Sequence, residues 1–350
     1  MRRALKIAAL ALAALVALFV LLVGGLTLSE WWPPPDETLK VSGGAATPLP
    51  AELKLLTWNI GYAAMDSETD FFMDGGRMSH GRSAEAVQAN LAAITAVLRE
   101  HKPDLVMLQE VDMHASRSYG IDERGQLEAS LKDYAAAFTT NYNVPYVPVP
   151  FGSPMGGVRS GLLTLTRTTP AEAHGLRLPG RQAWPNRLFN LKRMLTLVRL
   201  PAPGGKQLVL INAHLTAFDS VGNMRPLELA YLRERILAEQ SAGSYVIVGG
   251  DWNSAMPGGK TPACDKSQDD RSWLIDMPAD FIAAGWTWAA GLNAPTVRTL
   301  GAPRNSRSTC YAYIDGMLLS PGVELRRVGT VDLNFQNSDH NPVEVEVTLH

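Results

Sequence analysis

Cysteine is scarce in this sequence. Cys264 and Cys310 are the only two cysteines among 350 residues. So few thiols argue against a metal site built from cysteine ligands. An oxidising compartment would permit the two cysteines to pair, and the sequence leaves that pairing open.

A surplus of either charge is also missing. The chain has 32 basic and 34 acidic residues, for a formal net charge of −2. A strongly basic surface for duplex DNA is therefore not visible in the bulk charge, although a local patch can lie within a neutral total. A charged fraction of 19% and a hydrophobic fraction of 46% argue against disorder and are ample for a sizeable core.

One segment has no charge at all. Residues 7–28 form a run of 22 mostly apolar residues after Arg2, Arg3 and Lys6. As a helix this run would be about 33 Å long, enough to cross a hydrocarbon core of about 30 Å. A cleaved signal peptide usually has a shorter apolar core, of about 7–15 residues. We therefore expect residues 1–30 to be an uncleaved transmembrane signal anchor, with a cleaved signal peptide as the alternative.

The flanks of this run predict its orientation. Basic residues on the N-terminal side are typical of a cytoplasmic end, and Trp31 and Trp32 stand where interfacial aromatic residues belong. Residues 31–52, with several prolines and glycines, are interpreted as a tether. We expect a single-pass protein of the cytoplasmic membrane whose main domain, residues 53–350, is periplasmic or extracellular.

Short β-rich runs alternate with helical patterns in the main domain, which predicts an α/β fold. One helix is indicated by Val87, Leu91, Ile94 and Leu98 at helical spacing, and a second should begin near Pro226. Eight strand candidates suggest two packed sheets. These candidates are Leu53–Trp58, Leu105–Gln109, Leu162–Thr166, Met194–Leu200, Leu208–Ala213, Tyr245–Gly249, Ile314–Leu319 and Val343–Leu349.

Polar residues stand where several of these strands begin or end, which is where α/β enzymes collect their chemistry. Asp251 and Asn253 follow one strand candidate, and Asp339 and His340 precede the last one. Because Asp251 and Asn253 lie two residues apart, their side chains point the same way in extended geometry. This spacing suits one group that activates a water molecule and another that holds an oxygen.

Further polar residues end or interrupt apolar strands. Burying the Glu110 carboxylate is costly unless it is paired or bound to a cation, so it is a candidate metal ligand. Asp112 fits either a residue that supports a metal ligand or a solvated acid, and we favour the solvated acid. Asp315 interrupts an apolar strand and needs a partner such as a histidine. Asn59 and His214 also end strands, and taken singly a turn role for Asn59 and a structural role for His214 stay open.

The order and local context of these residues resemble the endonuclease/exonuclease/phosphatase superfamily, the fold of DNase I. The resemblance implies a four-layer α/β sandwich with two packed mixed β-sheets. It also implies hydrolysis of a phosphoester by in-line attack of water, with Mg²⁺ as the usual cation and Mn²⁺ as a possible substitute. The matching segments are Leu56–Ile60, Leu108–Asp112, Asn212–Leu215, Gly250–Asn253, Tyr313–Gly316 and Ser338–His340.

The resemblance assigns roles to the polar residues. Glu110 would bind the cation, with Asn59 and Asp339 completing or supporting its oxygen-rich shell. Independently of the resemblance, Arg298 and Arg304 are the leading candidates for contacting a substrate phosphate, because their loop leads directly to the strand that carries Asp315.

The remaining residues would carry the chemistry. Asp251 would orient or deprotonate the attacking water, and Asn253 would hold that water or a phosphate oxygen. His340 would be held by Asp315, which fixes its tautomer and supports its charged form. His214 would donate to a non-bridging oxygen as charge builds in the transition state.

The substrate stays open between three hypotheses. The anchor and the absence of a basic surplus favour a phosphodiesterase acting on a lipid head group or another small phosphoester near the bilayer. The same residues would serve an extracytoplasmic nuclease acting on DNA or RNA. A non-enzymatic binding protein on this fold is the third hypothesis, which the complete set of residues disfavours. Two segments between the motifs, Pro145–Gly157 and Gly175–Arg193, are expected to shape specificity.

Overall fold

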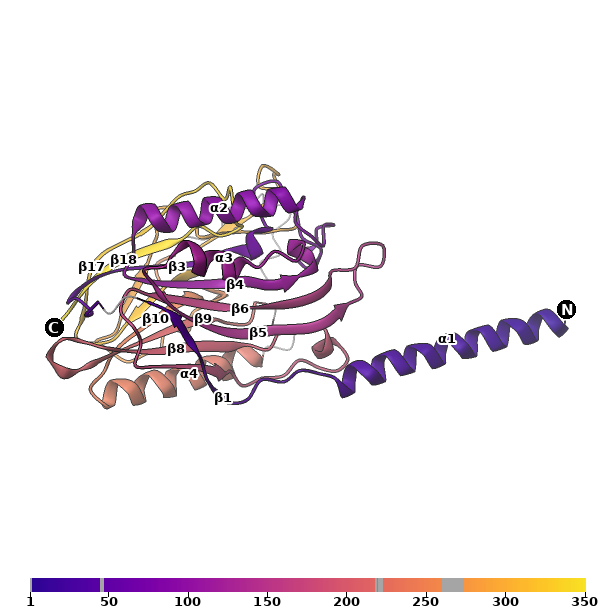
Figure 1. The fold of residues 1–350 in the computed structure, drawn as a ribbon, viewed down its shortest axis with the longest axis horizontal. Helices are drawn as coiled ribbons and strands as arrows, with labels where there is room; N and C mark the ends of the chain where they lie inside the picture. The colour runs from indigo at the N-terminus through magenta and orange to yellow at the C-terminus, as the bar shows by residue number, and fades with distance from the viewer. Residues whose placement is uncertain (1, 45–46, 218, 220–222, 260–273) are drawn as a thin grey trace.

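The computed structural model describes residues 2–44, 47–217, 219, 223–259 and 274–350. Two seven-stranded mixed sheets pack face to face, and helices cover their outer faces (Figure 1). This four-layer α/β sandwich confirms the predicted fold. Cys264 lies outside the described residues, so its pairing with Cys310 stays open.

The first sheet has the strand order β1-β7-β8-β9-β10-β16-β13. Its strands are β1 (Asp36–Thr38), β7 (Glu172–Arg177), β8 (Met194–Pro201), β9 (Gln207–His214), β10 (Tyr245–Asp251), β13 (Thr287–Ala290) and β16 (Asp315–Leu319). Only β9 and β10 pair in parallel in this sheet. Their C-terminal ends therefore lie side by side.

The second sheet has the strand order β17-β18-β3-β4-β6-β5-β2, with β3 and β4 in parallel. Its strands are β2 (Val41–Gly43), β3 (Glu52–Asn59), β4 (Leu105–Ala115), β5 (Ala135–Val147), β6 (Gly156–Thr166), β17 (Val323–Thr330) and β18 (Val343–Leu349). Two short pairs complete the strands, β11 (Ser254–Ala255) with β12 (Ile275–Asp276), and β14 (Val297–Arg298) with β15 (Tyr311–Ala312).

Helices pack on the outer faces as their apolar spacing predicts. The α-helices are α1 (Arg2–Leu28), α2 (Ala84–His101), α3 (Glu123–Ser130) and α4 (Met224–Ser241), and the 3-10 helices are η1 (Gly61–Ala63), η2 (Phe72–Asp74), η3 (Ser116–Ser118), η4 (Asn186–Leu188) and η5 (Pro203–Gly205). Leu91 and Ile94 of α2 are buried against the second sheet, and Leu232 and Ile236 of α4 against the first. Burial of each such side chain stabilises the fold by about 1.5–3 kcal/mol. The expected helices are thereby confirmed, with Pro226 in the first turn of α4.

Residues 31–52, interpreted from the sequence as a tether, contribute two short strands to the sheets. Within residues 31–52, β1 pairs with β7 at the edge of the first sheet, and β2 pairs with β5 at the edge of the second. An open sheet edge presents unpaired backbone groups, and these two short strands satisfy some of them. The folded body therefore begins near Asp36 rather than at residue 53.

The first helix stands apart from the sandwich. Helix α1 has no buried residue, and Figure 1 shows it extending away from the body. It is the one helix among the described residues that is long and apolar enough to cross a membrane, by length and composition. It could be a membrane anchor or a signal sequence.

Candidate active site

A buried amide pair sets the two sheets in register. Gln109 of β4 donates through Nε2 to Oδ1 of Asn212 in β9 at 2.7 Å, and Asn212 Nδ2 donates to the Leu108 carbonyl at 3.1 Å. Because both side chains are fully buried, each needs these partners. The pair holds Glu110, which follows Gln109, close to His214, which ends β9.

The eight predicted catalytic and metal-binding residues meet at one end of the sandwich. They come from the ends of β3, β9 and β10, the bulge in β4, the start of β16 and the loop before β18. Each is linked to another member by a hydrogen bond or by facing charged groups within 4 Å. The eight are Asn59, Glu110, His214, Asp251, Asn253, Asp315, Asp339 and His340.

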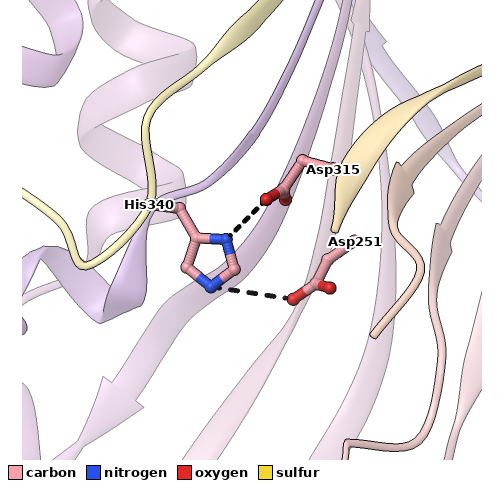
Figure 2. A group of neighbouring side chains, drawn as sticks. All are labelled: Asp251, Asp315 and His340. Carbon is pink, nitrogen blue, oxygen red and sulfur yellow. Dashed lines mark hydrogen bonds and ion pairs between the residues drawn. The ribbon is translucent and has the colours of Figure 1, made fainter. Parts of the chain in front are cut away.

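Asp315 holds the ring of His340. The Oδ2 atom of Asp315 lies 2.9 Å from Nδ1 of His340, while Nε2 of the ring faces Asp251 Oδ2 at 3.8 Å (Figure 2). Burial opposes a charged ring, yet the carboxylates of Asp315 and Asp339 raise the pKa of His340 well above its usual value. His340 is therefore favoured in its protonated form, with its Nε2 atom toward Asp251.

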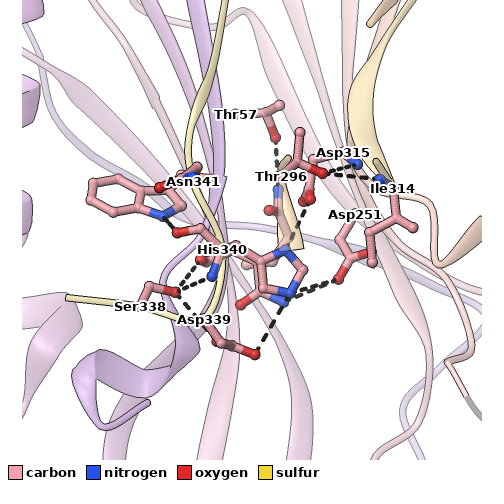
Figure 3. Close-up of polar contacts among 12 residues, drawn as sticks. Thr57, Asp251, Thr296, Ile314, Asp315, Ser338, Asp339, His340 and Asn341 are labelled. Carbon is pink, nitrogen blue, oxygen red and sulfur yellow. Dashed lines mark hydrogen bonds and ion pairs between the residues drawn. The ribbon is translucent and has the colours of Figure 1, made fainter. Parts of the chain in front are cut away.

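Backbone contacts fix this pair from both sides. Thr296 Oγ1 accepts hydrogen bonds from the backbone N–H groups of Ile314 and Asp315, at 2.9 and 3.1 Å. Ser338 Oγ accepts from the His340 N–H at 3.1 Å (Figure 3). These bonds position both side chains before any substrate binds.

Asp251 lies at the centre of the group. Its Oδ2 accepts from Asn59 Nδ2 at 3.1 Å, and its Oδ1 accepts from the Asn253 N–H at 2.9 Å. Burial, and then the charge of Asp315, raises the pKa of Asp251 to about 6. A carboxylate with a pKa near neutral and a fixed orientation is suited to accept a proton from water.

Glycine before Asp251 lets its strand approach β9. Gly250 has a φ of 152°, and a Cβ there would lie 1.8 Å from the carbonyl oxygen of Ala213. Only glycine avoids this clash. Asp251 and His214, the next residue of each strand, consequently become direct neighbours in register.

His214 is a neutral donor candidate. Burial, followed by the positive charges of Arg193 and His340, lowers the pKa of His214 well below its usual value. Its Nε2 lies 3.5 Å from Asp251 Oδ2 and 3.9 Å from Glu110 Oε1, and its buried Nδ1 has no hydrogen-bond partner among the described residues. A neutral imidazole offers one N–H, which can stabilise an oxyanion.

Glu110 and Asp339 fit a hard cation. Glu110 sits in a bulge of β4 with a φ of 56°. Burial, and then the charge of Asp339, raises the pKa of Glu110 to about 7, and burial also raises that of Asp339. A divalent cation would relieve this repulsion, and carboxylate oxygens are its preferred ligands. The Oδ1 atom of Asn59 already accepts from the Gly61 N–H at 3.0 Å, so ligation would use its second lone pair.

A second group could also hold a metal ion. Ligand atoms of Asp251, Asp315 and His340 lie within 4.8 Å of one another. We favour Glu110 and Asp339 as ligands instead, because Nδ1 of His340 is hydrogen-bonded to Asp315 and the raised pKa of the ring favours its protonated form. A protonated imidazole has no lone pair to give to a metal.

The two predicted phosphate-binding arginines have protein partners. Arg298 is 1% exposed, and its guanidinium donates to backbone carbonyls, including that of Asp66 at 2.6 Å and that of Thr69 at 3.0 Å. Arg304 donates to the side chains of Asn305 and Asn334. These contacts favour a structural role for Arg298, and its phosphate contact stays an untested prediction.

Sequence reasoning misread Asp112 and missed its partner. Asp112 was expected to be solvated, yet it is fully buried, with Arg117 NH2 at 2.9 Å from Oδ1 and Ser118 Oγ at 2.7 Å from Oδ2. Its position two residues after Glu110, on the same strand, was the available signal. Arg117 also stacks 3.2 Å above the ring of Tyr62. This ion pair places a buried positive charge near Glu110.

Asp74 in η2 was also missed. Burial, and then the charge of Asp339, raises the pKa of Asp74 to about 7. No strand candidate ends near this residue, so no pattern marked it. The negative charge of Asp339 therefore acts on Asp74 as well as on Glu110.

The family model for the endonuclease/exonuclease/phosphatase family matches residues 56–340, which include all eight site residues. The chain belongs to this family. Membership supports a hydrolytic phosphoesterase. No curated protein matches the chain by sequence.

Solved structures share the fold of this endonuclease/exonuclease/phosphatase family member. A family protein from Beutenbergia cavernae is 20% identical with a TM-score of 0.59, over 85% of this chain and 72% of that one. One from Leptotrichia buccalis is 13% identical with a TM-score of 0.54, over 85% and 100%. TDP2 from D. rerio, complexed with a single-strand DNA product, is 16% identical with a TM-score of 0.54, over 85% and 100%. At these identities the likeness extends to the fold alone.

Proposed function

We propose that this protein is a Mg²⁺-dependent phosphodiesterase that acts outside the cytoplasmic membrane on a lipid head group or another small phosphoester. Mn²⁺ is a possible substitute. The observation that carries the proposal is the Asp251 carboxylate, fixed by Asn59 and flanked by His214 and by the His340–Asp315 pair. In this arrangement Asp251 would serve as the proton acceptor, His214 as the neutral donor and protonated His340 as the positive charge beside them.

The side chains divide the chemistry. Asp251 accepts a proton from the attacking water, whose oxygen bonds to phosphorus as the ester P–O bond on the opposite side breaks. Asn253 holds that water or a phosphate oxygen. His214 donates to a non-bridging oxygen, and the charged His340 attracts the phosphate group. The leaving oxygen departs with the bonding electron pair and takes a proton from the solvent.

A divalent cation fits the carboxylates of Glu110 and Asp339, with Asn59 in support. When bound, it supplies Lewis-acid stabilisation of charge on the phosphoryl and leaving oxygens. The protein holds the carboxylate oxygens of Glu110 and Asp339 in fixed positions that are partly shielded from water. This shielding strengthens their electrostatic effect on the substrate.

The test compares substrates in one buffer. The full chain is supplied with phospholipid vesicles or with linear DNA, with Mg²⁺ or with a chelator, and the products of phosphoester cleavage are measured. Mg²⁺-dependent lipid cleavage that a folded His214→Ala variant loses supports the proposal. A folded wild-type chain that cleaves neither substrate contradicts it.

A nuclease is the second candidate. The likeness to TDP2, whose structure holds a single-strand DNA product, favours it. In the same assay, cleavage of DNA alone would assign the protein to this class. A steep loss of DNA binding with added salt would then be expected.

A further inference from the structure

Helix α1 leaves the sandwich from the end that carries the active site. Asp36 of β1 pairs with Leu176, which pairs with Leu195, then with Ala213 and Gly250 across the first sheet. The start of β1 is therefore level with the ends of β9 and β10. Since α1 precedes β1, a membrane that holds α1 lies beyond this end of the molecule.

The segment between α1 and β1 is docked against the body. Glu30, whose side chain is 9% exposed, lies 3.0 Å from Arg187 Nε and 3.2 Å from Lys192 Nζ. The ring of Trp32 lies 4.7 Å from the guanidinium of Arg181 and 5.3 Å from Lys192 Nζ. These contacts fix the exit of α1 from the body. The orientation of the active site relative to α1 is thereby set.

A second apolar feature reaches past the same end. The hairpin of β5 and β6 continues seven residues beyond the Leu108↔Leu163 pair to the Val147↔Gly156 pair, about 23 Å at 3.3 Å per residue. Trp32, four residues before Asp36, can lie no more than about 14 Å beyond the site. The hairpin therefore extends at least as far as this tryptophan, on the side toward which α1 extends (Figure 1).

The tip of this hairpin, residues 148–155, suits a bilayer. It contains no charged residue, and its Phe151 is 99% exposed. Val149 at the tip and Tyr146 just before it are 46% and 47% exposed. An uncharged loop with an exposed aromatic ring gains free energy by leaving water for the boundary of head groups and acyl chains.

We propose that residues 148–155 are a second membrane contact, which presses the active-site end of the sandwich against the bilayer surface. The substrate then reaches Asp251 from that surface, as the phosphodiester of an amphiphilic lipid. The substrate class rests on the proposed function, whereas the contact itself follows from the placement of the hairpin and α1.

Depth-dependent quenching tests the contact without using activity. The full chain with Phe151→Cys, labelled with an environment-sensitive fluorophore, is reconstituted into phosphatidylcholine–phosphatidylglycerol vesicles. Lys132→Cys, exposed before the start of β5 at the opposite end, is the matched control, and the parent chain gives the background of the native cysteines. Spin-labelled lipids should quench only the label at position 151. Equal exposure of both labels to aqueous iodide, or a label at position 151 shielded from iodide yet unquenched by lipid, would overturn the proposal.

An activity comparison tests its consequence. Phe151→Ser should lower cleavage of vesicle lipid at least about fivefold and leave that of a water-soluble phosphodiester, bis(p-nitrophenyl) phosphate, unchanged. Equal loss on both substrates, or no loss on vesicles, would contradict a membrane role. If the label is quenched by lipid but the wild-type chain cleaves no phosphoester, the contact stands and the proposed function fails.

Discussion

Asp315 and His340 form a buried pair, 2.9 Å between Oδ2 and Nδ1, although 25 residues separate them in the sequence. Asp315 begins β16, which pairs with β10 so that Asp315 lies opposite Asp251. His340 comes from the loop before β18 in the other sheet. One residue pair therefore joins the two sheets at the site and orients the imidazole toward Asp251.

Replacing Asp315 tests this positioning. Asp315→Asn keeps the size of the side chain but removes the charge that supports protonated His340. We expect kcat to fall by about 10–100-fold with little change in KM, because the ring is positioned less well for the transition state. Steady-state kinetics measure this, and Asp276→Asn, at an exposed position, is the control. A change in KM with kcat unchanged would contradict the positioning role of Asp315.

Metal binding should depend on the paired carboxylates. Glu110→Gln and Asp339→Asn each remove one charged oxygen ligand, so Mg²⁺ affinity should weaken by at least about tenfold. Titration calorimetry of the full chain measures the affinity directly. Affinity unchanged in both variants, with a loss in Asp251→Asn instead, would move the cation to the group around Asp251.

The amide pair between the sheets should stabilise the fold. Gln109→Ala removes the donor to the buried Oδ1 atom of Asn212. The loss should lower the free energy of unfolding by about 1–3 kcal/mol. Denaturant unfolding measures the loss. Gln126→Ala is the matched control, since Gln126 bonds Gln88 at the surface, and should cost under about 0.5 kcal/mol.

Asp66, whose backbone carbonyl accepts a hydrogen bond from Arg298, should make the stability of the protein depend on pH. Burial opposes ionisation of Asp66, but hydrogen bonds from Arg82, Asn90 and Thr69 outweigh it and lower its pKa. A depressed folded-state pKa stabilises the protein above the unfolded value of about 3.9, and that gain is lost as pH falls through the folded pKa.

Asp66→Asn should therefore lower Tm at pH 7, by an amount that shrinks as pH falls below about 4. Thermal unfolding of both proteins at several pH values measures the difference, with Asp276→Asn as the control. A difference in Tm that is the same at pH 7 and at acid pH would contradict the charged role of Asp66.

Sequence patterns predicted where polar side chains gather better than they predicted the structure around them. Residues at strand ends, such as Glu110 and His214, could be located from the sequence, because a polar residue that follows an apolar run marks the end of a strand. The residues alone indicated that Asp315 needs a partner such as a histidine, and the resemblance to the family implied that this partner is His340. Spacing alone could not place Arg298, whose four carbonyl acceptors come from loops distant in sequence or from its own turn.

The missed elements have physical reasons. Strand β5 begins Ala135-Ala136-Ala137, and alanine has a low preference for strands, so its pairing with β6 decides its structure. The short strands β1 and β2 are too brief to carry a periodic pattern and are set by the sheet edges they complete. Tertiary contacts therefore decided what local sequence could not.

The central claim is that Asp251 makes this end of the sandwich a phosphodiesterase site. The most direct measurement is hydrolysis of bis(p-nitrophenyl) phosphate by the full chain and by Asp251→Asn, with Mg²⁺ and with a chelator. We expect turnover that requires the metal and falls at least about 100-fold in a variant with unchanged thermal unfolding. Wild-type turnover in a folded Asp251→Asn protein would contradict the account.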